Sequence, residues 1–244
     1  MRGAATGTPM FDVRVVRKSF PTADGARRVV LRDVAFSFDR GEVIALLGAS
    51  GTGKTTLLRI VLGLDSLFEG QVRRDRRRIG AMFQEPLLLP WLTVEQNLRL
   101  VVTDAMQRPD IASLLEMVRL PGTERLYPRQ LSLGMARRIS LARALAVSPE
   151  ILVLDEPFAS LDPQLAATVA EVVARWRRET GASVVLAVHD LGQALRLASR
   201  VLVLAGTPAT LEADVAVPEG SDIAALQARL MERFRFFRRV EGGE

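Results

Sequence analysis

The segment Gly48-Ala-Ser-Gly-Thr-Gly-Lys-Thr55 constrains this chain more than any other part of its sequence. It fits the pattern G-x-x-x-x-G-K-[ST], between a short apolar run at Val43–Leu47 and a helical pattern at Lys54–Leu62. A glycine-rich loop in that position turns its backbone N–H groups, and the positive end of the helix, toward phosphate oxygens. The sequence therefore predicts a triphosphate-binding loop at the end of a buried strand.

Two side chains of the loop have more specific chemistry. Lys54 is expected to reach the β- and γ-phosphates, and the Thr55 hydroxyl is placed to bind Mg²⁺. The alternative, a chance glycine-rich turn, does not account for the strand before it and the helix after it. Many unrelated nucleotide hydrolases share such a loop. Its expected nucleotide contacts are Gly48, Ala49, Ser50, Gly51, Thr52, Gly53, Lys54, Thr55 and Thr56.

Two acidic residues follow the apolar run Ile151–Leu154. In a parallel sheet, the carboxyl end of such a strand emerges at the edge where ligands bind. Asp155 is then expected to hold Mg²⁺ through water, and Glu156 to orient or deprotonate an attacking water molecule. Two ordinary exposed acids at a strand end are the alternative, and the presence of the phosphate loop weighs against it.

The single histidine, His189, directly follows the apolar run Ser183–Val188. At the carboxyl end of a neighbouring strand, it could contact the γ-phosphate and the attacking water. An unremarkable surface or core histidine is the alternative.

Apolar runs alternate with helical patterns along most of the chain, which predicts an α/β fold with a mostly parallel sheet covered on both faces. Residues 11–16 and 28–38 instead alternate apolar and polar, as antiparallel strands do. The expected elements also include strands at Gln71–Met82, across a charged turn, and Arg200–Ala205, and helices at Gln164–Thr180, Leu191–Ser199 and Asp222–Phe237.

The spacing of apolar residues becomes helical between Pro86 and Val147, a stretch too long for an ordinary crossover. We therefore expect one domain with an inserted helical subdomain at about 86–147. The catalytic core, with its N-terminal antiparallel β-subdomain, is expected at about 11–85 and 148–206, and a short C-terminal extension at 207–244.

Composition excludes several functions. The chain has no cysteine, so disulfides, thiolate zinc sites and cysteine nucleophiles are absent. No apolar stretch approaches the roughly 18 residues of a membrane-spanning helix, and Met1–Thr8 does not resemble a secretion signal. A cytosolic protein is expected. The net charge is +5, and only Lys18 and Lys54 are lysines. Because acids are interspersed with the arginines, no nucleic-acid partner is expected.

Further segments, in order along the chain, resemble the nucleotide-binding subunit of ATP-binding-cassette (ABC) transporters. Gln84 resembles the Q-loop glutamine of that family, and Leu131-Ser-Leu-Gly-Met135 its signature motif. Ser160-Leu-Asp162 resembles the D-loop, and His189 the switch histidine. The resemblance extends from about Phe11 to Ala205 and identifies the chain as a P-loop NTPase of this family.

The resemblance implies ATP and Mg²⁺ as cofactors and ATP hydrolysis as the activity. It implies that Glu156, His189 and Gln84 take part in hydrolysis, that Gln84 also binds the metal beside Thr55 and Asp155, and that Phe20 stacks on adenine. A core role is the alternative for a lone aromatic residue.

The signature segment is implied to cap ATP held by a second subunit through Ser132 and Gly134. It departs from the usual L-S-G-G-Q, because Leu133 replaces the first glycine and Met135 the glutamine. A hydroxyl and an open backbone at a helix N-terminus remain. The departure concerns how tightly the capped site closes.

The segment Gln84-Glu-Pro-Leu-Leu-Leu-Pro-Trp91 is similar to that of nitrate, sulfonate and taurine importer ATPases. The implied partners are a second, identical cassette, membrane permease subunits and a periplasmic or lipid-anchored substrate-binding protein. The implied location is the cytoplasmic face of the inner membrane.

Three other functions remain open at this point. An exporter or lipid-transport ATPase differs only around residues 84–91 and in its partners. A non-transport cassette acting on DNA or ribosomes usually carries coiled-coil insertions or a tandem cassette. A kinase or GTPase switch leaves Leu131–Met135 and His189 unexplained.

Overall fold

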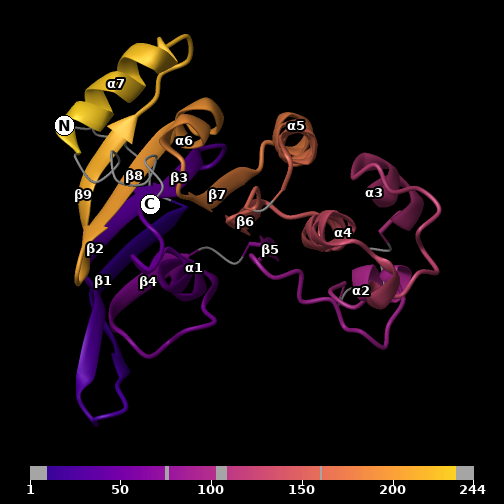
Figure 1. The fold of residues 1–244 in the computed structure, drawn as a ribbon, viewed down its shortest axis with the longest axis horizontal. Helices are drawn as coiled ribbons and strands as arrows, with labels where there is room; N and C mark the ends of the chain where they lie inside the picture. The colour runs from indigo at the N-terminus through magenta and orange to yellow at the C-terminus, as the bar shows by residue number, and fades with distance from the viewer. Residues whose placement is uncertain (1–9, 75–76, 103–108, 160, 235–244) are drawn as a thin grey trace.

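The computed structural model of the chain describes residues 10–74, 77–102, 109–159 and 161–234. In this part, nine strands form one sheet in the order β4-β1-β2-β9-β8-β3-β7-β6-β5, with helices on both faces (Figure 1). The predicted α/β fold with a mixed sheet is confirmed. The strands are β1 (Phe11–Pro21), β2 (Arg27–Phe38), β3 (Val43–Leu47), β4 (Glu69–Arg74), β5 (Ile79–Met82), β6 (Ile151–Asp155), β7 (Ser183–Val188), β8 (Arg200–Gly206) and β9 (Ala209–Ala216).

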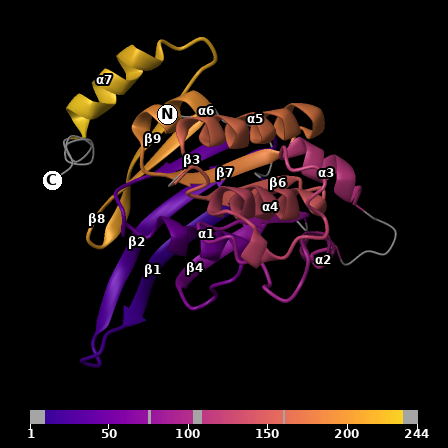
Figure 2. The ribbon, with the colours of Figure 1, turned by 45° about the vertical axis from the view of Figure 1, so that its right-hand side comes forward.

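The helices occupy two faces of the sheet and one lateral insertion (Figure 2). The helix α1 packs on one face, and α5 and α6 cover the other. Their bounds are α1 (Lys54–Leu62), α2 (Val94–Arg99), α3 (Ile111–Met117), the short 3₁₀ helix η1 (Pro128–Gln130), α4 (Leu133–Ala146), α5 (Pro163–Thr180), α6 (Leu191–Leu197) and α7 (Ile223–Arg233).

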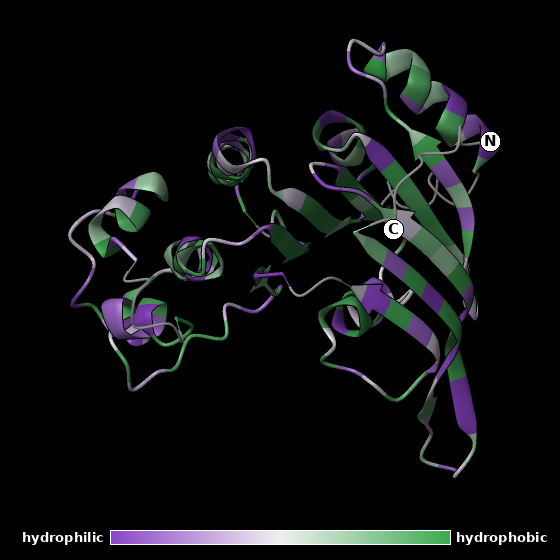
Figure 3. Cartoon of the chain, turned by 180° about the vertical axis from the view of Figure 1, so that it is seen from behind, coloured by the Kyte–Doolittle hydropathy of each residue, from purple (hydrophilic) through white to green (hydrophobic). Residues whose placement is uncertain are grey.

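The strands β8, β3, β7, β6 and β5 are parallel, and β3, β6 and β7 are buried along their whole length. Burial on both faces is the reason for their uninterrupted apolar sequences, which Figure 3 shows along the centre of the sheet. In register, Leu47 lies opposite Val188, and Asp155 opposite Ala187. The carboxyl ends of β3, β6 and β7 therefore end side by side, and the loops that follow them share one edge.

The antiparallel strands β4, β1 and β2 curl around α1. Phe11 and Phe38 stack with ring centroids 4.7 Å apart, and they share a core with α1 residues such as Leu57. The predicted strand Gln71–Met82 is in fact two strands, β4 and β5, at opposite ends of the sheet. Since only residues 75–78 separate them, these two ends lie no more than about 18 Å apart.

The sequence did not predict β9, because the strand series was expected to end at Ala205. In the structure β9 runs antiparallel to β8, and Ala209 pairs with Leu31 of β2. It therefore joins the antiparallel and parallel parts of the sheet. One face of β9 is exposed and carries charged residues, so its sequence lacks the apolar run of the central strands.

The helices α2, α3 and α4 lie to one side of the sheet, within the stretch whose apolar spacing predicted helices (Figure 1). Their core is continuous with that of the sheet, since Leu98, Leu115 and Ile139 belong to the same buried cluster as β6 and β7. Buried Asn97 orders the segment before α2 by bonding the backbone of Leu89, with Nδ2–O and N–Oδ1 distances of 3.2 and 2.8 Å.

The C-terminal helix α7 packs on α6 through Leu226 and Leu230. The predicted start was Asp222, and the helix begins one residue later, at Ile223. The side chain of Asp222 caps it. Residues 235–237 of the predicted helix lie outside the described part. No helix among the described residues is both long and apolar enough to cross a lipid bilayer.

Arg200 ties three strands together, which gives a first prediction. Its buried guanidinium donates to Asp214 Oδ1 (2.6 Å) on β9 and to the Ser37 carbonyl (2.6 Å) on β2. The bond to Asp214 raises the pKa of Arg200 above its usual value. We expect Asp214→Asn to lower the free energy of unfolding by roughly 1–2 kcal/mol, because the buried cation loses its closer carboxylate and keeps only the Ser37 carbonyl and the more distant Glu42. Chemical denaturation measures this change.

Glu179→Gln is the matched control, because Glu179 pairs with Arg175 (2.7 Å) on the exposed face of α5. We expect no measurable change from it. Equal destabilisation by both variants would contradict the role assigned to Arg200.

Candidate active site

In the loop after β3, backbone carbonyl oxygens accept hydrogen bonds from the lysine of the same loop. Lys54, buried at 4% exposure, donates from Nζ to the carbonyl oxygens of Gly48 (2.8 Å) and Ala49 (3.2 Å). The Thr52 hydroxyl also donates to the Ala49 carbonyl (2.8 Å). The ammonium is thus held by the backbone of the loop.

Two loop positions require glycine. Gly53 caps α1 with φ +91°, and a Cβ there would lie 2.9 Å from side-chain atoms of Val30 and Leu31 on β2. A Cβ on Gly48 would lie 2.6 Å from the carbonyl oxygen of Leu204 on β8. The loop therefore packs closely against both β2 and β8.

Asp155 ends β6 beside this loop, at 2% exposure. Its Oδ1 has no hydrogen-bond partner, although the Thr55 hydroxyl bonds the carboxylate. Burial raises the pKa of Asp155, and the bond from Thr55 opposes that shift. A buried carboxylate oxygen without a partner, next to a hydroxyl, fits the oxygen ligands that Mg²⁺ prefers. The described residues contain no cluster of three or more acids, histidines or cysteines. Phosphate oxygens and water would complete such a site.

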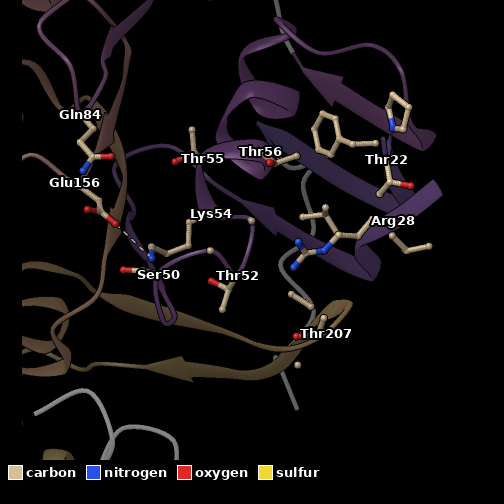
Figure 4. Close-up of a pocket in the computed structure, with 18 residues that line it drawn as sticks. Thr22, Arg28, Ser50, Thr52, Lys54, Thr55, Thr56, Gln84, Glu156 and Thr207 are labelled. Atoms are coloured by element: carbon tan, nitrogen blue, oxygen red, sulfur yellow. Dashed lines mark ion pairs between the residues drawn. The ribbon is translucent and has the colours of Figure 1, made fainter. Parts of the chain in front are cut away.

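Glu156 adopts a left-handed backbone conformation, with φ +47°. Non-glycine residues hold this conformation at a cost, and such strain is concentrated at functional sites. Its N–H donates to the Ala187 carbonyl (3.1 Å) on β7, and its Oε1 lies 3.5 Å from Lys54 Nζ (Figure 4). The carboxylate and the ammonium therefore face each other across the site.

A cavity of about 690 Å³ opens over the loop. The loop and α1 form its floor, and Gln84 and Glu156 lie together at one end (Figure 4). Phe20, 41% exposed, also lines it. The structure thus brings together these predicted site residues around one cavity: Phe20, Ser50, Gly51, Thr52, Gly53, Lys54, Thr55, Thr56, Gln84 and Glu156.

Other predicted residues lie outside the cavity lining. Asp155 lies buried behind it, and His189 is exposed after β7. Ser132 caps α4, accepting a hydrogen bond from the Met135 N–H (3.2 Å), and faces solvent. Gly134 packs against Leu165, where a Cβ would lie 2.9 Å from Cδ1.

The D-loop segment is described only in part, because Ser160 lies outside the described residues. Asp162 caps α5, accepting hydrogen bonds from the N–H groups of Gln164 and Leu165 at 3.0 Å each.

Sequence reasoning missed the outer wall of the cavity. Thr22 and Arg28 come from the β1–β2 hairpin, and Thr207 from the turn between β8 and β9 (Figure 4). Arg28 pairs with Phe20 across the hairpin, so hairpin register could have identified it. Thr207 had no signal, since β9 itself was not predicted.

Three features occur together in this fold. The phosphate loop follows β3, Asp155 and Glu156 stand at the end of β6, and the helices α2 to α4 lie to one side of the sheet. Together they define an ATPase of the ABC type. The sequence matches the family described as ABC transporter over residues 31–159. The chain belongs to this family, as the motifs predicted.

Several relatives cover most of the chain. An aliphatic sulfonates import ATP-binding protein, SsuB 2, of Pseudomonas syringae pv. tomato is 40% identical over 206 residues, or 84% of this chain and 87% of that protein. SsuB of Bacillus subtilis is 35% identical, over 91% of this chain and 93% of its own length.

Among solved structures, the dimeric bacterial ABC transporter cassette MJ0796 matches with a TM-score of 0.76 and 28% identity. The match covers 86% of this chain and 99% of that chain. A post-hydrolysis form of the same cassette, bound to ADP and phosphate, matches with a TM-score of 0.77. The chain is accordingly an ATP-hydrolysing cassette.

Burial of Asp155 generates a prediction about stability. Because its pKa lies above the ordinary 3.8, the folded state binds this proton more tightly than the unfolded chain. Its charge therefore destabilises the nucleotide-free protein once the pH rises through that pKa. We expect Asp155→Asn to raise the melting temperature at pH 7 by roughly 2–4 °C, and the gain to vanish as the pH falls toward 3.8.

Calorimetry without nucleotide measures the effect. Glu156→Gln serves as the control, since Glu156 has an ion-pair partner in Lys54 and gains nothing from neutralisation. A lower melting temperature for Asp155→Asn at pH 7 would contradict this account.

Proposed function

We propose that the chain is the ATPase of an importer whose cargo is an aliphatic sulfonate or a related small solute, such as nitrate or taurine. The names of the relatives support the direction and the cargo class. The observation that carries the hydrolytic role is the approach of Lys54 and Glu156 to 3.5 Å within one cavity.

The contacts of Lys54 suggest how binding prepares hydrolysis. Its ammonium bonds loop carbonyls and lies 3.5 Å from Glu156. When the β- and γ-phosphates enter, they compete for the ammonium. Glu156 then loses its cation and is free to accept a proton from the attacking water. The loop N–H groups and the N-terminus of α1 hold the phosphate charge.

The remaining polar groups have supporting roles. Thr55, Asp155 and Gln84 would hold Mg²⁺, which when bound neutralises developing charge on the phosphate oxygens. His189, at the same edge of the sheet, would contact the γ-phosphate. Phe20 would stack on the adenine at the far end of the cavity, where its ring is exposed.

We infer that two copies pair head to tail, with twofold symmetry. Ser132 and Gly134 lie at the start of α4 and do not line the chain's own cavity. Ser132 is exposed to solvent there. A second copy could bring its α4 onto this cavity. The dimeric form of the structural relative supports this arrangement.

We propose that residues 11–85 and 148–206 act as the catalytic core, 86–147 as the signature arm and 207–244 as an extension. Leu87, Trp91 and Leu100 are at least half exposed on the arm, and permease subunits would cover them on the cytoplasmic face of the inner membrane. A substrate-binding protein would deliver the cargo from outside.

Glu156→Gln tests the hydrolytic assignment. The amide cannot accept a proton from water, so we expect the hydrolysis rate to fall by at least about a hundredfold. ATP affinity should stay within about twofold or increase, because the phosphate contacts remain. Phosphate release and equilibrium binding measure the two quantities.

Glu171→Gln, on the exposed face of α5, is the control and should behave like the parent. Hydrolysis by Glu156→Gln at the parent rate would refute the mechanism.

For the cargo, uptake of a labelled alkanesulfonate by cells should require the parent chain and fail with Glu156→Gln. Uptake independent of this chain would refute the proposed cargo.

Leu133 provides a second test. Its side chain, 54% exposed, follows the Ser132 cap at the helix end expected to meet the other subunit's phosphates. Removing it should let the two surfaces approach more closely. We expect Leu133→Gly to raise the hydrolysis rate by roughly threefold to tenfold, equivalent to about 1 kcal/mol of closure.

Leu64→Gly, at an exposed loop position, is the control for a general effect of glycine. A slower Leu133→Gly protein with an unchanged melting temperature would show that Leu133 contributes to closure instead of hindering it.

A further inference from the structure

One of the chain's two lysines lies in the phosphate loop, and the other is Lys18 on β1. Lys18 is buried, at 3% exposure. Its Nζ donates to Asp65 Oδ1 (2.7 Å) and to the Leu67 carbonyl (2.9 Å), and it lies 4.5 Å from the centroid of the Phe20 ring. The ammonium is therefore hydrogen-bonded to a carboxylate and a carbonyl and also lies near an aromatic ring.

The backbone accounts for this geometry. Lys18 and Phe20 are two residues apart on β1, so their side chains share one face of the strand. A register shift between Lys18 and Ser19 leaves Val30 of β2 without a partner on β1. Such bulges re-aim side chains. Val30 itself lines the nucleotide cavity and would contact a Cβ at Gly53.

The partners of Lys18 connect it to the C-terminal end of α1, the helix whose first residue is Lys54. Asp65 and Leu67 lie in the loop between α1 and β4, and the Asp65 N–H donates to the Arg59 carbonyl of α1 (3.2 Å). The helix α1 begins at Lys54. The ion pair with Asp65 (2.6 Å to Oδ2) thus fixes the Lys18 ammonium to the element that carries the phosphate loop.

We propose that Lys18 is a positioning residue for the nucleotide base. Its ammonium, fixed by Asp65, holds the Phe20 ring through a cation–π contact. The ring therefore presents a preset surface to the adenine, and less conformational freedom is lost when the base binds. A compact ammonium makes three divergent contacts that the planar guanidinium of arginine does not reproduce. The proposal rests on the proposed stacking of adenine on Phe20.

The test compares two probes, Mg²⁺–ATP and Mg²⁺–tripolyphosphate, which has no base. In Lys18→Met, the Phe20 ring loses its cation while the phosphate loop is unchanged. We expect affinity for ATP to fall roughly fivefold and affinity for tripolyphosphate to stay the same, by calorimetric titration. Asp65→Asn, which retains the lysine but loosens it, should give a smaller loss in the same direction.

Arg17→Met is the matched control, since Arg17 is the exposed neighbour on the other face of β1. It should change neither affinity. If Lys18→Met fails to fold, Asp65→Asn provides the test. Equal losses for both probes would show a merely structural role and overturn the proposal, as would unchanged ATP affinity.

Phe20→Ala separates this inference from its premise. If that variant binds ATP as tightly as the parent, adenine does not stack on Phe20 and the base subsite is misassigned. If it weakens ATP binding and Lys18→Met does not, stacking stands and the role of Lys18 is wrong.

Discussion

The site depends on the register of three buried parallel strands. Because β3, β6 and β7 end level with one another, the phosphate loop, the acidic pair and His189 emerge at one edge. A shift of one residue in β6 would turn Asp155 to the other face of the sheet. Apolar burial on both faces of these strands is thus the physical basis of a polar, reactive site.

Charge within the site is balanced in a way that binding can change. Lys54 lies between loop carbonyls and Glu156, whereas Asp155 has an oxygen without a partner. Phosphate oxygens would compete with Glu156 for the Lys54 ammonium, and a cation would pair with the Asp155 oxygen.

Parts of the fold and of the site could be predicted from sequence where a local pattern of residues was distinctive. The glycine-rich loop, the uninterrupted apolar strands and the segment Leu131–Met135 each had a distinct pattern. The strand β9 alternates apolar and polar residues, but it lacks the uninterrupted apolar run from which the other late strands were predicted. The contact of Lys18 with Asp65 depends on the path of the loop after α1, which no local pattern encodes.

The edge strands of the sheet, β4 and β5, are joined by a short connection. The strand β4 borders the wall that carries Phe20, and β5 leads directly to Gln84. Only residues 75–78 separate β4 from β5 along the chain. Because four residues can span no more than about 18 Å, the end of β4 and the start of β5 cannot move further apart than that length.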